Sequence, residues 1–222
     1  MSHDPQVEAA KKIMSPAIHS KTGAEIFPGY EPGTELGWGN LVAGPEAHGN
    51  AVDQFKYVVY KDTNWDWKTF NLERDSAAAD KADDGLMDAV NPDLKKFSGH
   101  GGKLILYHGW SDQQVAPRST INYYSSVVKT MGGLEKTSDW IRLFMVPGMG
   151  HCGGGEGPNT FDMVPQLERW VEQGNAPTQV EAAHKTNGQV DRTRLLCPYP
   201  QVGKYKGTGS IDEASNFVCK EP

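Results

Sequence analysis

The sequence predicts an α/β fold with a parallel sheet in the second half of the chain. Strand and helix patterns alternate twice between residues 101 and 174, and each strand pattern is a short apolar run bounded by glycine or proline. Such runs are typical of strands that are buried on both faces of a sheet. The strand–helix–strand order implies parallel strands joined by right-handed crossovers.

The predicted elements of this half follow one another closely. Strands are expected at residues 103–107 and 140–146, each followed by a loop and then a helix, at residues 118–131 and 161–173. Proline at the first turn and glycine at the end support the first helix. Residues 180–184 are expected to form an edge strand.

The first half of the chain shows little strand–helix alternation. Short helices are predicted at residues 6–14 and 52–60, and residues 23–49 are rich in glycine and proline, as irregular loops are. This half lacks the apolar density of an independent core and is expected to pack on another element as part of a lid or cap. The sequence therefore predicts part of a lid region at residues 1–100 and part of a catalytic domain at residues 101–222.

Composition excludes two classes of partner. The 222 residues carry a formal net charge of −6, and the sequence has no cluster of lysine and arginine. Nucleic acid is therefore not an expected partner. No apolar run approaches the ~20 residues that cross a membrane, so a membrane is not expected either. The first residues show neither the basic nor the apolar region of a signal peptide.

Three cysteines leave at least one thiol unpaired within the chain. Cys197 and Cys219 lie in a tail rich in proline, glycine and tyrosine, which a disulfide would staple, and Cys152 would then be left over. Three reduced thiols in a cytosolic protein are the alternative. Composition does not decide between them.

A carboxylate and a histidine follow the two predicted strands. Asp112 lies in the loop after the first strand, and His151 lies in the glycine-rich loop after the second. Active-site groups of open α/β sheets collect at the carboxyl ends of the strands, and α/β-hydrolases run nucleophile, acid, base along the chain. We therefore expect Asp112 to be the catalytic carboxylate, which orients the imidazole ring of the base. We expect His151 to be that general base.

Simpler interpretations apply to each residue alone. An aspartate after a strand is often a turn or cap residue, and a histidine in a glycine-rich loop is often solvated. The pairing, the order and the strand context favour catalysis. His108 is predicted to be structural, bonding the loop backbone. A zinc site of His108, His151 and Cys152 lacks compact spacing and an evident fourth ligand. No metal and no cofactor are expected.

The nucleophile is not recognisable. The pattern G-x-S-x-G occurs nowhere in the chain. Ser111 has glutamine where the second glycine should be and adjoins the predicted acid, whereas Ser125 and Ser126 fall within a predicted helix. The sequence thus predicts an acid and a base without a serine to activate.

Two strings carry a resemblance to a known family. GGKLILYHGWSDQQVAP, residues 101–117, resembles the acid loop of the tannase and feruloyl esterase family, and VPGMGHCGG, residues 146–154, resembles its base loop. The cysteine-bearing tail resembles the family's C-terminal closure, and residues 6–13 and 27–33 resemble the later part of its lid domain. The resemblance covers almost the whole chain. It implies the C-terminal portion of an α/β-hydrolase fold with part of a lid domain.

The resemblance also implies a function. It predicts a carboxylic ester hydrolase that acts on small aromatic esters (gallate, ferulate or related) by a Ser-His-Asp mechanism and is secreted or periplasmic. An upstream segment or chain would supply the nucleophile and a cysteine partner for Cys152. The family's calcium loop has no match here, and four acidic residues are expected to form a solvated loop without metal: Asp80, Asp83, Asp84 and Asp88.

Two alternatives remain open. One is a non-catalytic binding or interaction module derived from a hydrolase, whose folding would not depend on His151. The other is a small hydrolase that uses an unconventional nucleophile such as Ser111.

Overall fold

The computed structural model describes residues 4–40 and 44–222, and the chain divides into two units, Met1–Val90 and Asn91–Pro222. The division follows residue 90, whereas the sequence placed it near residue 100. The role of the first unit as part of a lid stays a prediction. Within the described residues, no helix is both long and apolar enough to cross a membrane.

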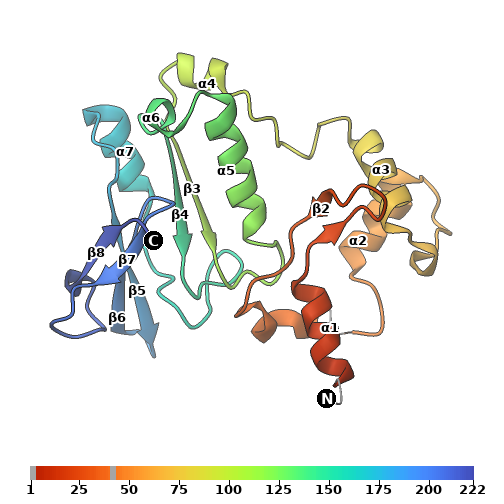
Figure 1. The fold of residues 1–222 in the computed structure, drawn as a ribbon, viewed down its shortest axis with the longest axis horizontal. Coiled ribbons are helices and arrows are strands. Elements are labelled where there is room, and N and C mark those ends of the chain that lie inside the picture. Colours follow the sequence, from red (N-terminus) through yellow and green to blue (C-terminus); the bar gives the residue numbers. More distant parts are fainter. Residues whose placement is uncertain (1–3, 41–43) are drawn as a thin grey trace. The chain divides into compact units, whose positions relative to one another are not determined.

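A pair of parallel strands forms the centre of the second unit. Strand β3 (Leu104–Gly109) pairs with β4 (Ile141–Val146) in a register that runs from Leu104 opposite Ile141 to Gly109 opposite Val146. The connection contains helices α5 (Arg118–Thr130) and α6 (Leu134–Thr137), as Figure 1 shows. Parallel neighbours need such a crossover. The predicted parallel pair is confirmed. Helix α4 (Lys95–Gly99) precedes it.

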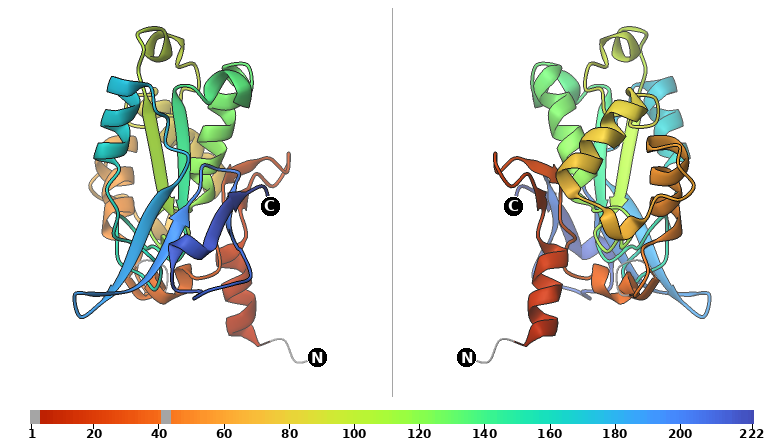
Figure 2. Two further views of the ribbon diagram at one scale, coloured as in Figure 1. Left: turned by 90° about the vertical axis from the view of Figure 1, so that its left-hand side faces the viewer. Right: turned by 90° about the vertical axis from the view of Figure 1, so that its right-hand side faces the viewer.

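Strand β4 is buried on both faces because its side chains alternate between two layers. Ile141, Leu143 and Met145 pack with α5 through one cluster, together with Ile121, Tyr124, Val127 and Trp140. On the other face, Phe144 and Val146 contact Val180, Ala182 and Leu196. Helix α7 (Val164–Gln173) lies on the side of the strands away from α5 (Figure 2). This burial explains the continuous apolar run in the sequence.

Two antiparallel pairs close the second unit. Strand β5 (Val180–Thr186) pairs with β6 (Gln189–Leu196), and β7 (Val202–Tyr205) pairs with β8 (Phe217–Lys220), which follows the 3-10 turn Ala214–Asn216. The predicted edge strand at residues 180–184 is therefore one arm of a hairpin in its own sheet.

The tail disulfide joins Cys197 to Cys219, whose Cα atoms are 5.5 Å apart. This confirms the staple and contradicts the alternative of three reduced thiols. Cys152 is free and exposed.

Short elements make up the first unit. They are α1 (Pro5–Met14), β1 (Ala17–Ile18), β2 (Glu25–Phe27), the 3-10 turn Thr34–Asn40, α2 (Gly49–Asp53), the π-helical turn Gln54–Val59, the 3-10 turn Trp67–Thr69 and α3 (Leu72–Asp83). The loop predicted at residues 23–49 is wrong in part, because β2 and a 3-10 turn lie within it. Residues 41–43 of that loop lie outside the described residues.

The acidic residues predicted as a solvated loop lie partly in a helix. Asp80 and Asp83 belong to α3. The Asp83 carboxylate accepts hydrogen bonds from the backbone N–H groups of Met87 and Asp88 at 2.9 and 3.0 Å. Part of this acidic segment is therefore ordered by its own backbone.

A buried carboxylate links α3 to Tyr60 and to the residue that caps the helix. Asp75, on α3, accepts from the Tyr60 hydroxyl, from Arg74 Nε and Nη2 at 2.5 and 2.9 Å, and from the Asn71 N–H at 2.7 Å. The Arg74 guanidinium holds the pKa of Asp75 well below its usual range, although burial by itself raises that pKa. Since an isolated buried charge is costly, these partners stabilise the packing of α3.

We predict that Asp75→Asn destabilises the first unit by about 2 kcal/mol, the scale of hydrogen bonds to a buried charged group. Urea dependence of hydrogen exchange at the α3 amides measures this loss. Asp80→Asn, on the exposed side of the same helix, is the control and should change stability by less than about 0.5 kcal/mol. Equal effects of the two substitutions would contradict a stabilising role for the Asp75 cluster.

Candidate active site

The structure brings together the acid and the base that the sequence singled out. Asp112 lies in the loop after β3 and is only 3% exposed, and His151 lies in the loop after β4. Nδ1 of His151 is 2.8 Å from Oδ2 of Asp112. Both loops follow the carboxyl ends of adjoining parallel strands, so they meet at one edge of the sheet. This geometry suits a catalytic pair, whose role stays a prediction.

Backbone contacts lock the two loops together. The N–H of Trp110 donates to the Val146 carbonyl at 2.9 Å, and the N–H of Ser111 donates to the Met149 carbonyl at 3.0 Å. Gly109 makes this approach possible, because a Cβ atom there would lie 2.2 Å from the Met149 carbonyl oxygen. The acid loop is therefore fixed against the base loop before any side chain contributes.

The base loop folds back on itself around His151. Gly150 N–H donates to the Gly154 carbonyl at 3.2 Å. Gly155 has a φ of +87°, and a Cβ there would lie 2.2 Å from the Gly148 carbonyl oxygen, so only glycine fits. This tight loop leaves the His151 side chain 34% exposed, beside the exposed Cys152.

Within the described part of the chain, the Asp112 carboxylate has four hydrogen-bond donors. Oδ1 accepts from the N–H groups of Gln114 and Val115 at 2.7 and 2.9 Å. Oδ2 contacts His151 Nδ1 and, at 3.0 Å, His108 Nε2. Burial by itself raises the pKa of Asp112, but these bonds, led by that from His108, together hold the pKa well below its usual range. The group therefore stays an anion at neutral pH.

His108 does not bond the loop backbone, and that prediction was wrong. Its ring reaches two side chains, with Nε2 at Asp112 Oδ2 and Nδ1 at 2.6 Å from Oγ1 of Thr120 on α5. The ring is at the end of β3, so its direction is set by the strand. Thr120 is not predictable from the sequence, since no local pattern shows which residue of a helix faces a strand end.

The other ring nitrogen of His151 is available for chemistry. Its Nε2 makes no hydrogen bond within residues 4–40 and 44–222, and the ring is partly exposed. Among the same residues, no serine hydroxyl bonds His151; Ser126, on α5, donates to the Tyr123 carbonyl instead. His151 is thus placed to exchange a proton with a group that approaches its exposed side.

The geometry gives no support to a zinc site at His108, His151 and Cys152. Within the described part of the chain, no group of three or more histidine, cysteine and acidic side chains is arranged to hold a metal ion. Both histidines of the zinc alternative, His108 and His151, hydrogen-bond to Asp112.

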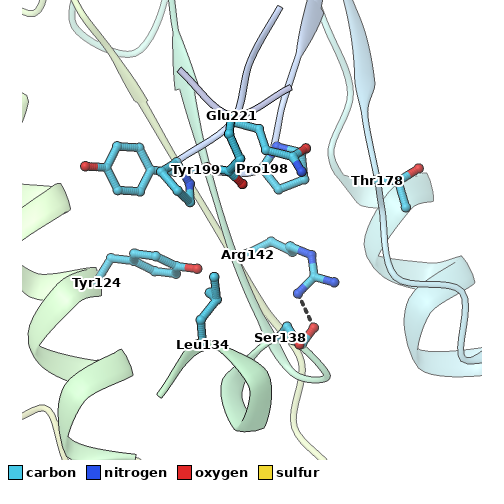
Figure 3. A pocket seen from close by; sticks show the side chains of 10 residues that line it. Tyr124, Leu134, Ser138, Arg142, Thr178, Pro198, Tyr199 and Glu221 are labelled. Carbon is cyan, nitrogen blue, oxygen red and sulfur yellow. Dashed lines mark hydrogen bonds between the residues drawn. The ribbon is translucent and has the colours of Figure 1, made fainter. Parts of the chain in front are cut away.

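A separate cavity of about 260 Å³ adjoins the opposite end of β4. Figure 3 shows Arg142 and Tyr124 among its lining side chains. The Arg142 guanidinium donates to the backbone carbonyls of Ser138 and Ile141 and lies 5.3 Å from the Trp170 ring. Arg142 is therefore engaged by the fold, at the strand end away from Asp112 and His151.

Nearly the whole chain is similar to known proteins. The sequence profile described as tannase and feruloyl esterase matches residues 3–220. The chain belongs to the tannase and feruloyl esterase family. An uncharacterized esterase of Xanthomonas campestris pv. campestris is 34% identical, over 97% of this chain and 46% of its own length.

Two further relatives sharpen the comparison. The mono(2-hydroxyethyl) terephthalate hydrolase of Piscinibacter sakaiensis is 46% identical over 60% of this chain and 22% of its own length. The crystal structure of feruloyl esterase B from Aspergillus oryzae superposes with a TM-score of 0.90 at 29% identity, covering 97% of this chain and 45% of that one. The predicted fold class, a portion of an α/β-hydrolase, is confirmed. The chain spans less than half the length of the relatives that match nearly all of it.

We predict that Asp112 titrates below the ordinary aspartate value of 3.8. A depressed folded-state pKa means that the stability this carboxylate contributes is fully present above about pH 3.8 and is lost as the pH falls further. The ¹³C shift of the Asp112 carboxyl carbon, followed during acidification, measures this directly. A titration midpoint at or above 3.8 in the folded protein would contradict the hydrogen-bonded anion.

Proposed function

We propose that this chain supplies the acid and the base of a carboxylic ester hydrolase that acts on small aromatic esters by a Ser-His-Asp mechanism. The observation that carries the proposal is the hydrogen bond from His151 to the buried, ionised Asp112 at the carboxyl ends of two parallel strands. The relatives' names support the substrate class, since one is a feruloyl esterase and another hydrolyses a terephthalate ester.

The residues divide the chemistry as follows. A serine hydroxyl attacks the ester carbonyl carbon while His151 Nε2 takes its proton, and Asp112 stays ionised and holds the Nδ1–H. The imidazolium then gives that proton to the alcohol oxygen as the C–O bond breaks, which leaves an acyl-serine. A water molecule then attacks the acyl carbonyl carbon while His151 takes its proton. The imidazolium returns that proton to the serine oxygen as the acyl–oxygen bond breaks, which releases the aromatic acid and the free serine. His151 thus acts twice as base and twice as acid.

The nucleophile is proposed to come from an upstream segment or chain. The sequence of this chain contains no G-x-S-x-G elbow, and it spans less than half of its relatives. The same segment would carry a cysteine that pairs with Cys152, which is free and exposed beside His151. The Cys197–Cys219 disulfide supports a secreted or periplasmic location, because such bonds persist in oxidising compartments.

We expect the product of the full reading frame that contains this chain to hydrolyse methyl ferulate or methyl gallate, and the chain alone to hydrolyse neither. His151→Ala should lower kcat/KM of the active product by at least about 10³-fold, because the serine loses its base. Steady-state kinetics measure both. The matched control is His184→Ala, which removes a histidine bonded to Asp191 in the β5–β6 hairpin and should leave the rate unchanged.

Three outcomes would count against the proposal. Full activity in His151→Ala would exclude the triad. Activity of the chain alone, lost in His151→Ala, would place the nucleophile within it, with Ser111 the first to test. No hydrolysis of any aromatic ester by the full product would favour a non-catalytic module.

A further inference from the structure

Two histidines share one oxygen of the Asp112 carboxylate. His151 Nδ1 and His108 Nε2 lie 2.8 and 3.0 Å from Oδ2. An ionised carboxylate only accepts hydrogen bonds, so each of these nitrogens carries a proton. The proposed mechanism uses only the bond from His151. The second bond comes from a ring that is only 11% exposed and touches no other group of the mechanism.

Thr120 supports the tautomer of the His108 ring that the bond to Asp112 requires. Its hydroxyl is 2.6 Å from His108 Nδ1, and a hydroxyl can donate to an unprotonated ring nitrogen. With Nε2 protonated toward Asp112, the neutral ring accepts the Thr120 O–H at Nδ1. A charged His108 would instead set a second cation against the oxygen that His151 must use when it takes up a proton, and like charges at that distance repel.

The two donors to Oδ2 come from different kinds of element. His108 and Thr120 belong to β3 and α5, which pack against the buried core, whereas His151 lies in a glycine-rich loop. The backbone N–H groups of Gln114 and Val115 hold only Oδ1. Without His108, the carboxylate would be free to rotate about Oδ1. No residue of β3 or α5 would then hold Oδ2 in position to accept from His151.

We propose that His108, held by Thr120 as the neutral Nε2–H tautomer, is a positioning residue that clamps Oδ2 of Asp112 and thereby fixes the Nδ1–H tautomer of His151. Only its catalytic consequence rests on the proposed esterase function. The clamp itself is a property of this chain. Sites of this kind need a supporting shell on rigid elements, because a loosely held first group lowers the rate steeply.

Imidazole ¹⁵N NMR on the labelled chain tests the clamp without any turnover. In the unsubstituted protein we expect a protonated Nε2 on His108 and a protonated Nδ1 on His151, the latter seen as a slowly exchanging low-field proton. His108→Leu should abolish that proton signal and leave His151 with mixed tautomers. His108→Gln should keep the signal, because the glutamine amide reaches Oδ2 with a donor in the place of Nε2.

A second pair of variants keeps the test sound if His108→Leu does not fold. Thr120→Val removes the partner of His108 Nδ1 and should speed solvent exchange of the His108 Nε2 proton, and Thr120→Ser should restore slow exchange. Amide spectra verify that each variant is folded. An unchanged His151 Nδ1–H signal in folded His108→Leu would overturn the positioning role. An unchanged exchange rate of the His108 Nε2 proton in Thr120→Val would overturn the role of Thr120.

Kinetics of the full reading frame separate this proposal from the esterase proposal. His108→Leu should lower kcat by about 10²-fold with KM nearly unchanged, the scale of a misplaced catalytic group, and His108→Gln should recover most of the rate. A purely structural role predicts equal losses in the two variants and would overturn the proposal. A full product without any esterase activity, together with the expected NMR changes, would refute the esterase function and leave the clamp established.

Discussion

The structure of the second unit depends on the buried carboxylate of Asp112, whose two oxygens both accept hydrogen bonds. Removing the Asp112 anion from water is expensive unless hydrogen bonds replace its hydration. Its donors come from its own loop, from the end of β3 and from the loop after β4. All must be in place together, so the parallel pairing of β3 with β4 and the close approach at Gly109 are conditions for an ionised Asp112.

The sequence was sufficient where chemistry followed a regular local pattern. Asp112 and His151 could be found because each comes directly after an apolar run, and parallel strands place such positions side by side. The β5–β6 hairpin was only half predicted, although Asn187-Gly188, both with positive φ, is the dipeptide that favours a two-residue hairpin turn. The second strand of the hairpin is therefore marked in the local sequence by its turn.

Other features could not be found in local sequence at all. Thr120 reaches His108 only because the crossover lays α5 against β3, and Tyr60 reaches Asp75 across fifteen residues of the first unit. Both contacts are set by tertiary packing, which periodicity does not encode. The start of helix α7 at Val164 rather than at Phe161 is different, because its causes are local: the Asp162 carboxylate accepts the Val164 N–H, and Pro165 follows in the first turn.

The segment after β6 gives the two edges of the parallel pair different properties. Along β4, Pro198 forms an antiparallel bridge with Phe144, and Tyr199 N–H donates to the Leu143 carbonyl at 2.7 Å. Proline has no N–H to continue a ladder of hydrogen bonds, so the segment along β4 is a poor partner for another strand. Along β3, the described residues place no strand on the outer edge. A further strand can therefore pair with this sheet only along β3. If that strand were parallel, its carboxyl end would lie beside the loops of Asp112 and His151.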